Sequence, residues 1–418
     1  MLTILQNFDQ TDGADPVAGL VQASDGTFYG TTSNSGAYQD GTVFRLSLGP
    51  VELTSVTPCR LVDTRQTGNP IQGGTWQNFN VPQLGGCNVP ASALAYSLNV
   101  TVVPYDGEPL GYLTVWPQGS PKPVVSTMNS LDGRIKANAA LVTAGAGSAI
   151  SVFASNTTNL IIDIDGYFTI PGVNTLQFYA LAPCRVLDTR NSNGDLGGPY
   201  LQSGQERDFP VLESNCQIPS SAQAYSMNFT VVPYNGEPLG YLTVWPQGSP
   251  KPTVSTLNNL TATIVANAAI VPAGTGGGIA VYPSGNTQLV ADIDGYFAPA
   301  GDGGLSLYPA PPCRVIDTRK GNGAFSGELT VDVVDSVCAP PATAQAYVFN
   351  ATVVPVGPLG YLTLWPDTET QPLASTLNAI DGAITSNMAI VSNLDGKTDA
   401  FASGTTQLIL DISSYFAP

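Results

Sequence analysis

Arginine and aspartate recur together in one short motif, R-x-x-D-T-R, and at this spacing they could bind an anionic group or form ion pairs. The motif occurs three times and holds six of the nine arginines in the chain. Arginine can hold both oxygens of a carboxylate at once and lysine cannot, so this repeated choice predicts bidentate contacts. We interpret the motif as an internal ion-pair network that includes the acidic end of the last strand; capture of an anionic sugar or a peptide carboxylate is the alternative. Its members are Arg60, Asp63, Arg65, Arg185, Asp188, Arg190, Arg314, Asp317 and Arg319.

Carboxylates elsewhere suggest two further chemistries, and neither pattern is complete in all three copies. The segments D-I-D-G-Y-F at 163–168 and 292–297 could offer oxygens to calcium, but Ser413 replaces the second acid in the third copy. Glu108 and Glu237 lie in matching loops and could form a glycosidase pair, but the third copy lacks that position. The chain also has no histidine, the usual general base for a serine or cysteine nucleophile. We therefore expect a protein that is not an enzyme and that has no metal and no cofactor.

Cysteines occur as one pair in each copy, which predicts three disulfides and an oxidising compartment. Buried free thiols are the alternative; zinc is disfavoured because the chain has neither histidine nor a C-x-x-C motif. Each bridge would stabilise the fold by about 3 to 4 kcal/mol. We therefore expect the protein to be exported. The expected pairs are Cys59 with Cys87, Cys184 with Cys216, and Cys313 with Cys338.

All these residues belong to one pattern of about 120 residues that occurs three times in the chain. Such a repeat predicts three copies of one structural unit. Tyr96, Leu98 and Val100 alternate with polar residues, as in a half-buried antiparallel strand. Low charge and frequent glycine and proline also favour an all-β chain. We predict three tandem β-sandwiches of jelly-roll or immunoglobulin-like type. Their expected bounds are 51–171, 172–300 and 301–418, and the short Pro- and Gly-containing linkers predict a semi-rigid rod of separate domains.

Residues 1–50 differ from the rest of the chain and predict a separate small β-sheet unit. Strands are expected at 2–8, 20–32 and 42–48, with a hairpin turn at Asp25-Gly26. Gly36 and the run Gly41-Thr42-Val43-Phe44 resemble a single copy of the bacterial GloVer-type tandem repeat. Such a small sheet is marginal by itself. We therefore expect it to dock on the first repeat or on another molecule.

The sequence N-x-T stands at the same strand position in each copy. Strand alternation places these asparagines on the face opposite the tyrosine, where a glycan is sterically conceivable. We interpret these asparagines as a polar ladder along the strand, and glycosylation is the alternative. The candidate glycosylation sites are Asn99, Asn228 and Asn350.

The signature P-x-R-x-x-D-T-R, G-Y-L-T, D-x-x-G-Y-F resembles a repeat of secreted and cell-wall-associated bacterial proteins, which implies an extracellular or cell-surface location. A net charge of −17 argues against nucleic acid, and no stretch is apolar enough for membrane insertion. We expect an extracellular structural protein that assembles with itself into a filament or surface layer, with residues 1–50 docking on a neighbouring subunit. The alternative is a multivalent module that binds cell-wall or other glycans through exposed aromatics such as Trp76, Tyr105 and Tyr234.

Overall fold

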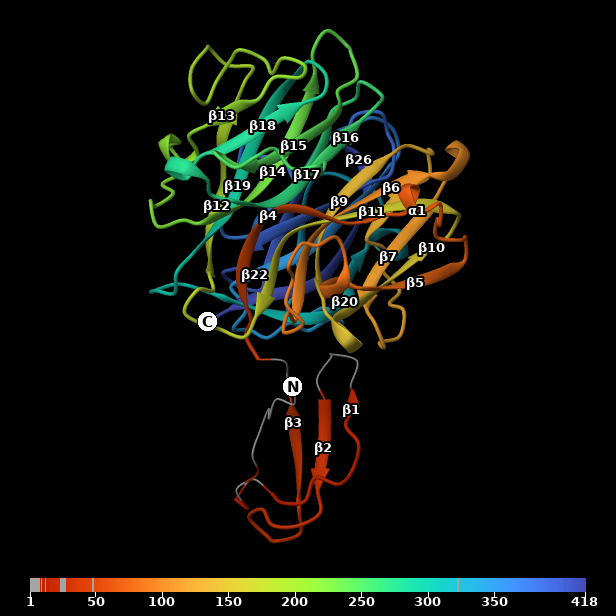
Figure 1. Ribbon diagram of the computed structural model, residues 1–418, viewed down its shortest axis with the longest axis vertical. Coiled ribbons are helices and arrows are strands. Elements are labelled where there is room, and N and C mark those ends of the chain that lie inside the picture. The colour runs from red at the N-terminus through yellow and green to blue at the C-terminus, as the bar shows by residue number, and fades with distance from the viewer. Residues whose placement is uncertain (1–7, 9, 12, 23–27, 47–48, 322) are drawn as a thin grey trace. The chain divides into compact units, whose positions relative to one another are not determined.

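The computed structural model of the chain divides into two compact units, Met1–Gly49 and Pro50–Pro418. It describes residues 8, 10–11, 13–22, 28–46, 49–321 and 323–418 (Figure 1). The strands lie in antiparallel sheets and the helices are single turns, so the expected all-β fold is confirmed. Within the described residues, none of the helices has the length and hydropathy of a membrane span.

The N-terminal unit is a three-stranded antiparallel sheet of order β1-β2-β3. Its strands are β1 (Val21–Gln22), β2 (Phe28–Thr32) and β3 (Thr42–Leu46). Phe8 packs edge-on against Phe44, with 4.9 Å between the ring centroids. The expected turn at 25–26 and most of the expected strand at 2–8 lie outside the described residues.

In the C-terminal unit, repeat 1 (residues 50–171) forms two four-stranded sheets that face each other. The alternating residues Tyr96, Leu98, Val100 and Val102 point between the sheets and are fully buried there, as their period predicted. The first sheet consists of β4 (Glu52–Asp63), β11 (Thr158–Thr169), β6 (Ala95–Pro104) and β9 (Lys136–Thr143). The second consists of β5 (Thr75–Asn80), β10 (Ala149–Ala154), β7 (Gly111–Pro117) and β8 (Met128–Ser130).

Repeat 2 (residues 172–300) has the same two sheets in the same order. Its first sheet consists of β12 (Gln177–Asp188), β19 (Thr287–Ala298), β14 (Ala224–Pro233) and β17 (Val265–Pro272). Its second sheet consists of β13 (Arg207–Phe209), β18 (Ile279–Pro283), β15 (Gly240–Pro246) and β16 (Leu257–Asn259).

Repeat 3 (residues 301–418) differs in one respect, because a single strand runs through both of its sheets. That strand, β26 (Lys397–Ala417), takes the places that two strands hold in each of the other repeats. The others are β20 (Ser306–Asp317), β21 (Phe325–Asp332), β22 (Ala346–Pro355), β23 (Leu359–Pro366), β24 (Leu377–Ala379) and β25 (Thr385–Ser392). The helical turns of the whole chain are α1 (Thr64–Thr67), η1 (Val81–Gln83), η2 (Tyr105–Gly107), η3 (Ala146–Ser148), η4 (Val211–Glu213), η5 (Thr275–Gly277) and η6 (Thr318–Lys320).

The three repeats share a further core, so the rod of separate sandwiches predicted from the short linkers is wrong. Phe178 of repeat 2 lies 4.4 Å from Phe416 of repeat 3 and 5.1 Å from Phe297, measured between ring centroids. Phe168 of repeat 1 lies 6.5 Å from Phe297. These rings are buried among small and branched residues that all three repeats contribute. Figure 1 shows the repeats gathered into one body.

Backbone contacts close these junctions in a cyclic order, which gives the C-terminal unit a pseudo-threefold arrangement. The first strands of the repeats meet pairwise near their beginnings. Leu53 pairs with Leu176, Phe178 with Leu305, and Val51 with Leu307. Each repeat therefore contributes the same two positions to two different neighbours.

Candidate functional site: the network between the repeats

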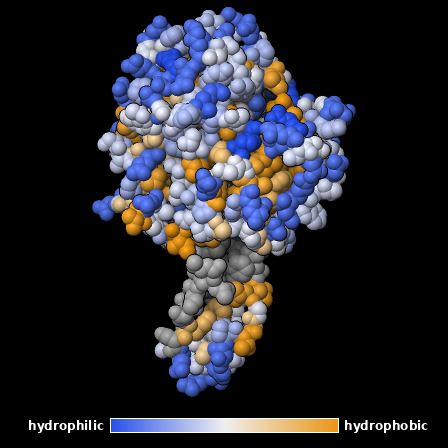
Figure 2. All heavy atoms as spheres, viewed as in Figure 1, coloured by the Kyte–Doolittle hydropathy of each residue, from blue (hydrophilic) through white to orange (hydrophobic). Residues whose placement is uncertain are grey.

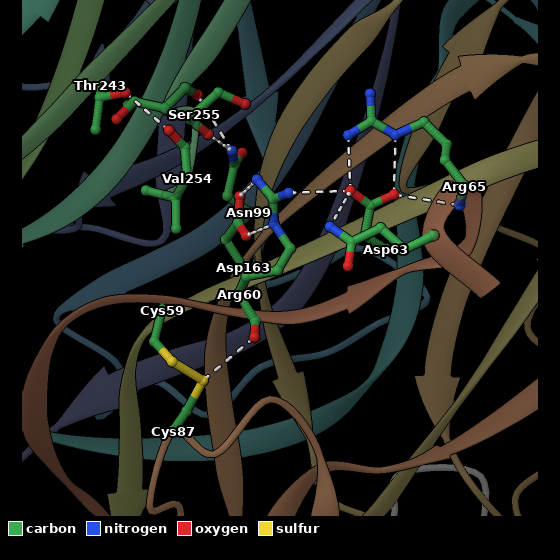
Figure 3. A network of polar contacts seen from close by, with 12 residues as sticks. Cys59, Arg60, Asp63, Arg65, Cys87, Asn99, Asp163, Thr243, Val254 and Ser255 are labelled. Carbon is green, nitrogen blue, oxygen red and sulfur yellow. Dashed lines mark hydrogen bonds and ion pairs between the residues drawn. A yellow bond between two sulfur atoms is a disulfide. The ribbon is translucent and has the colours of Figure 1, made fainter. Parts of the chain in front are cut away.

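The R-x-x-D-T-R motif forms an internal ion-pair network in every repeat, as Figure 3 shows for repeat 1. Arg60 is held by Asp163 through Nε and Nη2 and reaches Asp63 through Nη1 at 3.2 Å. Arg65 makes a bidentate contact to Asp63, with Nε to Oδ1 at 2.8 Å and Nη2 to Oδ2 at 2.7 Å. The side chain of Asp163 is almost fully buried. Arginine is needed here because each guanidinium serves two oxygens in a fixed plane.

Local structure explains why the motif folds in this way. Asp63 caps helix α1 by accepting a hydrogen bond from the backbone N–H of Arg65 at 3.2 Å. The hydrogen bonds and charge of Arg65 hold the pKa of Asp63 below its ordinary value. For Asp163, burial outweighs the contacts from Arg60 and raises its pKa to about 6. Two aspartates of one network therefore have opposite pKa shifts, because the arginine contacts outweigh burial at Asp63 and burial outweighs them at Asp163.

The equivalent contacts recur in the other two repeats. Arg185 Nε lies 2.6 Å from Asp292 Oδ1, and Arg314 Nε lies 2.8 Å from Asp411 Oδ1. Arg190 binds Asp188 and Arg319 binds Asp317 in the same bidentate way. These arrangements match the internal network that the motif predicted. They commit the guanidinium groups to aspartates of the same repeat, and so give no support to capture of an external anion.

Six asparagines form three hydrogen-bonded pairs, one at each junction between repeats, and we call this cyclic arrangement the asparagine ring. Asn267 donates to Asn99 Oδ1 at 2.9 Å, and its own Oδ1 accepts from the backbone N–H of Ala139 at 3.1 Å. Asn99 donates to the carbonyl oxygen of Ser255 at 2.6 Å (Figure 3). The same contacts link repeat 2 to repeat 3 and repeat 3 to repeat 1. The members are Asn99, Asn138, Asn228, Asn267, Asn350 and Asn387.

This ring uses the N-x-T asparagines as a polar ladder between the repeats, and it leaves the alternative, that they carry glycans, without support. The side-chain nitrogens of Asn99, Asn228 and Asn350 donate to carbonyl oxygens of the neighbouring repeat. Asn99 is buried, and the strand face opposite the tyrosine is an interface instead of a solvent-facing surface. The ladder's partners are the strands that carry Asn138, Asn267 and Asn387, which recur at one fixed position in all three copies.

The remaining acids lie apart from the ion-pair network. No cluster of three potential metal ligands is found among the described residues. Asp165 is buried and Asp294 is partly buried, and loss of solvation raises the pKa of each to about 7. Each keeps one carboxyl oxygen without a hydrogen-bond partner. Glu108 and Glu237 are exposed on loops of different repeats.

The three expected disulfides are confirmed: Cys59 with Cys87, Cys184 with Cys216, and Cys313 with Cys338. No described cysteine is free. Disulfides persist in oxidising surroundings, so the three bridges point to an extracellular environment. No family model matches the chain, and comparison with curated proteins finds no significant match.

Proposed function

We propose that this protein is an extracellular structural protein whose copies assemble with one another, each through its N-terminal unit. The proposal rests on the division of the chain into two compact units of unequal size. One contains all three repeats and all three disulfides, which suits a durable building block. The other is a three-stranded sheet, which is at the lower limit of what is stable without a partner surface.

Apolar side chains on the N-terminal unit support its role as a connector. Val17, Val21, Tyr38 and Val43 are largely exposed, with values of 69 to 88%. Figure 2 shows apolar residues beside hydrophilic ones on the visible face of this unit. Burying one such valine against a neighbouring copy would contribute about 1.5 kcal/mol or more.

Strand β3 offers a route for the contact. The strand pairs with β2, and Val43 on it is 76% exposed. An exposed apolar side chain of this kind can pack against an apolar surface of another chain. We therefore assign the subunit contact to β3 and to the apolar residues around it.

Light scattering and negative-stain electron microscopy, under non-reducing conditions, test the proposal on the full chain and on residues 50–418. The full chain should form regular assemblies and the truncated chain should stay monomeric. Val43→Lys should also prevent assembly, since a charged side chain there would oppose burial against a neighbouring copy. Val173→Lys is the matched control, because Val173 is fully exposed between repeats 1 and 2. If the full chain remains monomeric, or if residues 50–418 assemble equally well, the proposal is wrong.

A further inference from the structure

A cavity of about 290 Å³ lies where the three repeats meet. Equivalent segments of each repeat line it, namely 128–137, 257–266 and 378–386, where the S-T-x-N strand turns into the strand that carries a ring asparagine. Its volume is close to the lower end of the roughly 300 to 1,000 Å³ that small-molecule sites occupy. The cavity lies within the C-terminal unit and does not depend on how the subunits assemble.

Two side-chain amides on the cavity wall have uncommitted donors. Asn129 Oδ1 accepts from Ser126 Oγ at 3.0 Å, and Asn258 Oδ1 accepts from Ser255 Oγ at 3.2 Å. These contacts orient both amides, and no acceptor for either NH₂ group is found among the described residues. Asn378, the third equivalent, instead donates to the carbonyl oxygen of Gly360 at 3.0 Å. The cavity therefore presents two amide donors to a ligand with oxygen acceptors.

The charges around the cavity cancel. Lys136 Nζ lies 3.0 Å from Asp132 Oδ2 and donates to the carbonyl oxygen of Ile384 at 3.0 Å. Arg134 pairs with Asp381 of repeat 3. Two cations thus face two carboxylates, and these contacts keep the pKa values of Asp132 and Asp381 below their ordinary range. An uncharged ligand would leave these pairs intact, whereas a charged one would compete with them.

The walls of the cavity are unlike one another, although the repeats are related by pseudo-symmetry. Where repeat 1 has Arg134 and Lys136, repeat 2 has Thr263 and Val265. The repeat 2 wall therefore combines apolar Val265 with hydroxyl groups, and Leu260 and Ile264 extend its apolar part. A pyranose ring matches such a site, since it has hydroxyl oxygens around its rim and an apolar C–H face.

We propose that this cavity binds one neutral sugar unit, as a monosaccharide or as the end of an oligosaccharide. Hydroxyl oxygens of the sugar accept hydrogen bonds from Asn129 and Asn258, and a C–H face of the ring lies against Val265. The chain has one such site, formed jointly by the three repeats, instead of one in each repeat. The inference goes beyond the proposed structural function, and sugar binding and assembly can fail independently.

Titration of the full chain with glucose, galactose, mannose and N-acetylglucosamine tests the proposal, followed by calorimetry and by methyl NMR of the wild-type protein. At least one sugar should bind saturably and shift the methyl signals of Val265 and Ile264. Replacing both donors (Asn129→Ala with Asn258→Ala) should weaken binding about tenfold or more. Gln205→Ala is the control and should leave the affinity unchanged, because Gln205 is exposed and does not line the cavity.

Three results would overturn the proposal. The first is that none of the four sugars binds saturably to the wild-type chain. The second is that binding leaves the Val265 and Ile264 methyl signals in place, which would locate the sugar elsewhere. The third is that glucuronate binds more tightly than glucose, which would contradict the argument from balanced charge. Light scattering on the same samples reports assembly separately.

Discussion

At the residue scale, the asparagine ring shows how a polar side chain can specify an interface. Asparagine carries two donors and an acceptor in one plane, so a single residue can bond two neighbouring strands at once. Asn267 uses all of this capacity: its nitrogen bonds Asn99 and the carbonyl oxygen of Thr256, while its oxygen accepts from Ala139. Because the site is 1% exposed, water cannot replace these contacts. The ring therefore fixes the register of one repeat against the next.

Replacing Asn267 with alanine should lower the free energy of unfolding by about 2 to 4 kcal/mol, because three buried polar groups lose their partner. Urea-induced unfolding of residues 50–418 measures this loss. Gln205→Ala is a suitable control, since Gln205 is exposed and its side chain has no hydrogen bond in the described structure. If Asn267→Ala and the control lose the same free energy of unfolding, the ring specifies how the repeats align without stabilising the fold.

The buried acids Asp165 and Asp294 should make the protein less stable as the pH rises from about 4 to about 7. Burial raises the pKa of each to about 7, so the folded chain keeps protons that the unfolded chain releases near its ordinary value of 3.8. Stability falls with pH wherever the folded state binds more protons. Replacing both residues with asparagine should flatten this dependence and raise stability near pH 8 by on the order of 2 kcal/mol per site. Unfolding curves at several pH values measure the effect; an unchanged slope would contradict it.

At the element scale, each disulfide ties the first strand of a repeat to the loop that comes after its second strand. In repeat 2, the bridge joins β12 to the segment after η4 across 32 residues. Replacing Cys184 and Cys216 together with alanine should lower the free energy of unfolding by about 3 kcal/mol, because the unfolded chain regains the freedom of a long loop. Guanidinium unfolding in the absence of reductant measures this. Wild-type protein unfolded with reductant serves as the reference. Its free energy of unfolding should fall further than that of the double variant, since all three bridges then open.

Sequence periodicity predicted the strands well and misjudged what lies on one of their faces. In β6, Tyr96, Leu98 and Val100 point into the sandwich, as the alternation of apolar residues indicated. The opposite face carries Ser97, Asn99 and Thr101, and polar residues there favoured solvent, yet this face is buried too. A polar interface between repeats has the same period as a solvated surface. Only the partner strands distinguish the two, and a single sequence does not reveal them.

The ion-pair network and the cavity could likewise be predicted only in part from a single sequence. The arginine and aspartate residues could be paired from the sequence, because their types and spacing demand opposite charges nearby. The cavity could not be predicted, because its wall is formed by segments from three repeats that are far apart in the sequence. Arg134 of repeat 1 pairs with Asp381 of repeat 3 only because the repeats close into a cycle. That closure also explains why the predicted rod is wrong.

At the scale of the whole molecule, the C-terminal unit resembles a trimer joined into one chain. The residues that meet across each junction are copies of one another, as with Leu53 against Leu176 and Phe178 against Leu305. A repeat by itself would expose the apolar face that the shared core now covers, including Phe168 and Leu141 in repeat 1. Exposed apolar surface of this kind favours association with an identical partner.

Residues 50–171, produced alone under oxidising conditions, should therefore assemble into a homotrimer. Repeat 1 contains both sides of every junction, with Asn99 and Asn138 for the ring and Asp132 standing where repeat 3 has Asp381 as the partner of Arg134. Size-exclusion chromatography with light scattering gives the mass. Asn138→Ala in the same fragment should shift the mass toward that of the monomer. Each junction would then lose the two bonds that Asn138 makes in the full chain to Asn350 and Met388, whose counterparts in repeat 1 are Asn99 and Ala139. A folded monomer of unaltered residues 50–171 would mean that the sandwich core and its disulfide are sufficient, and that the shared core contributes little to folding.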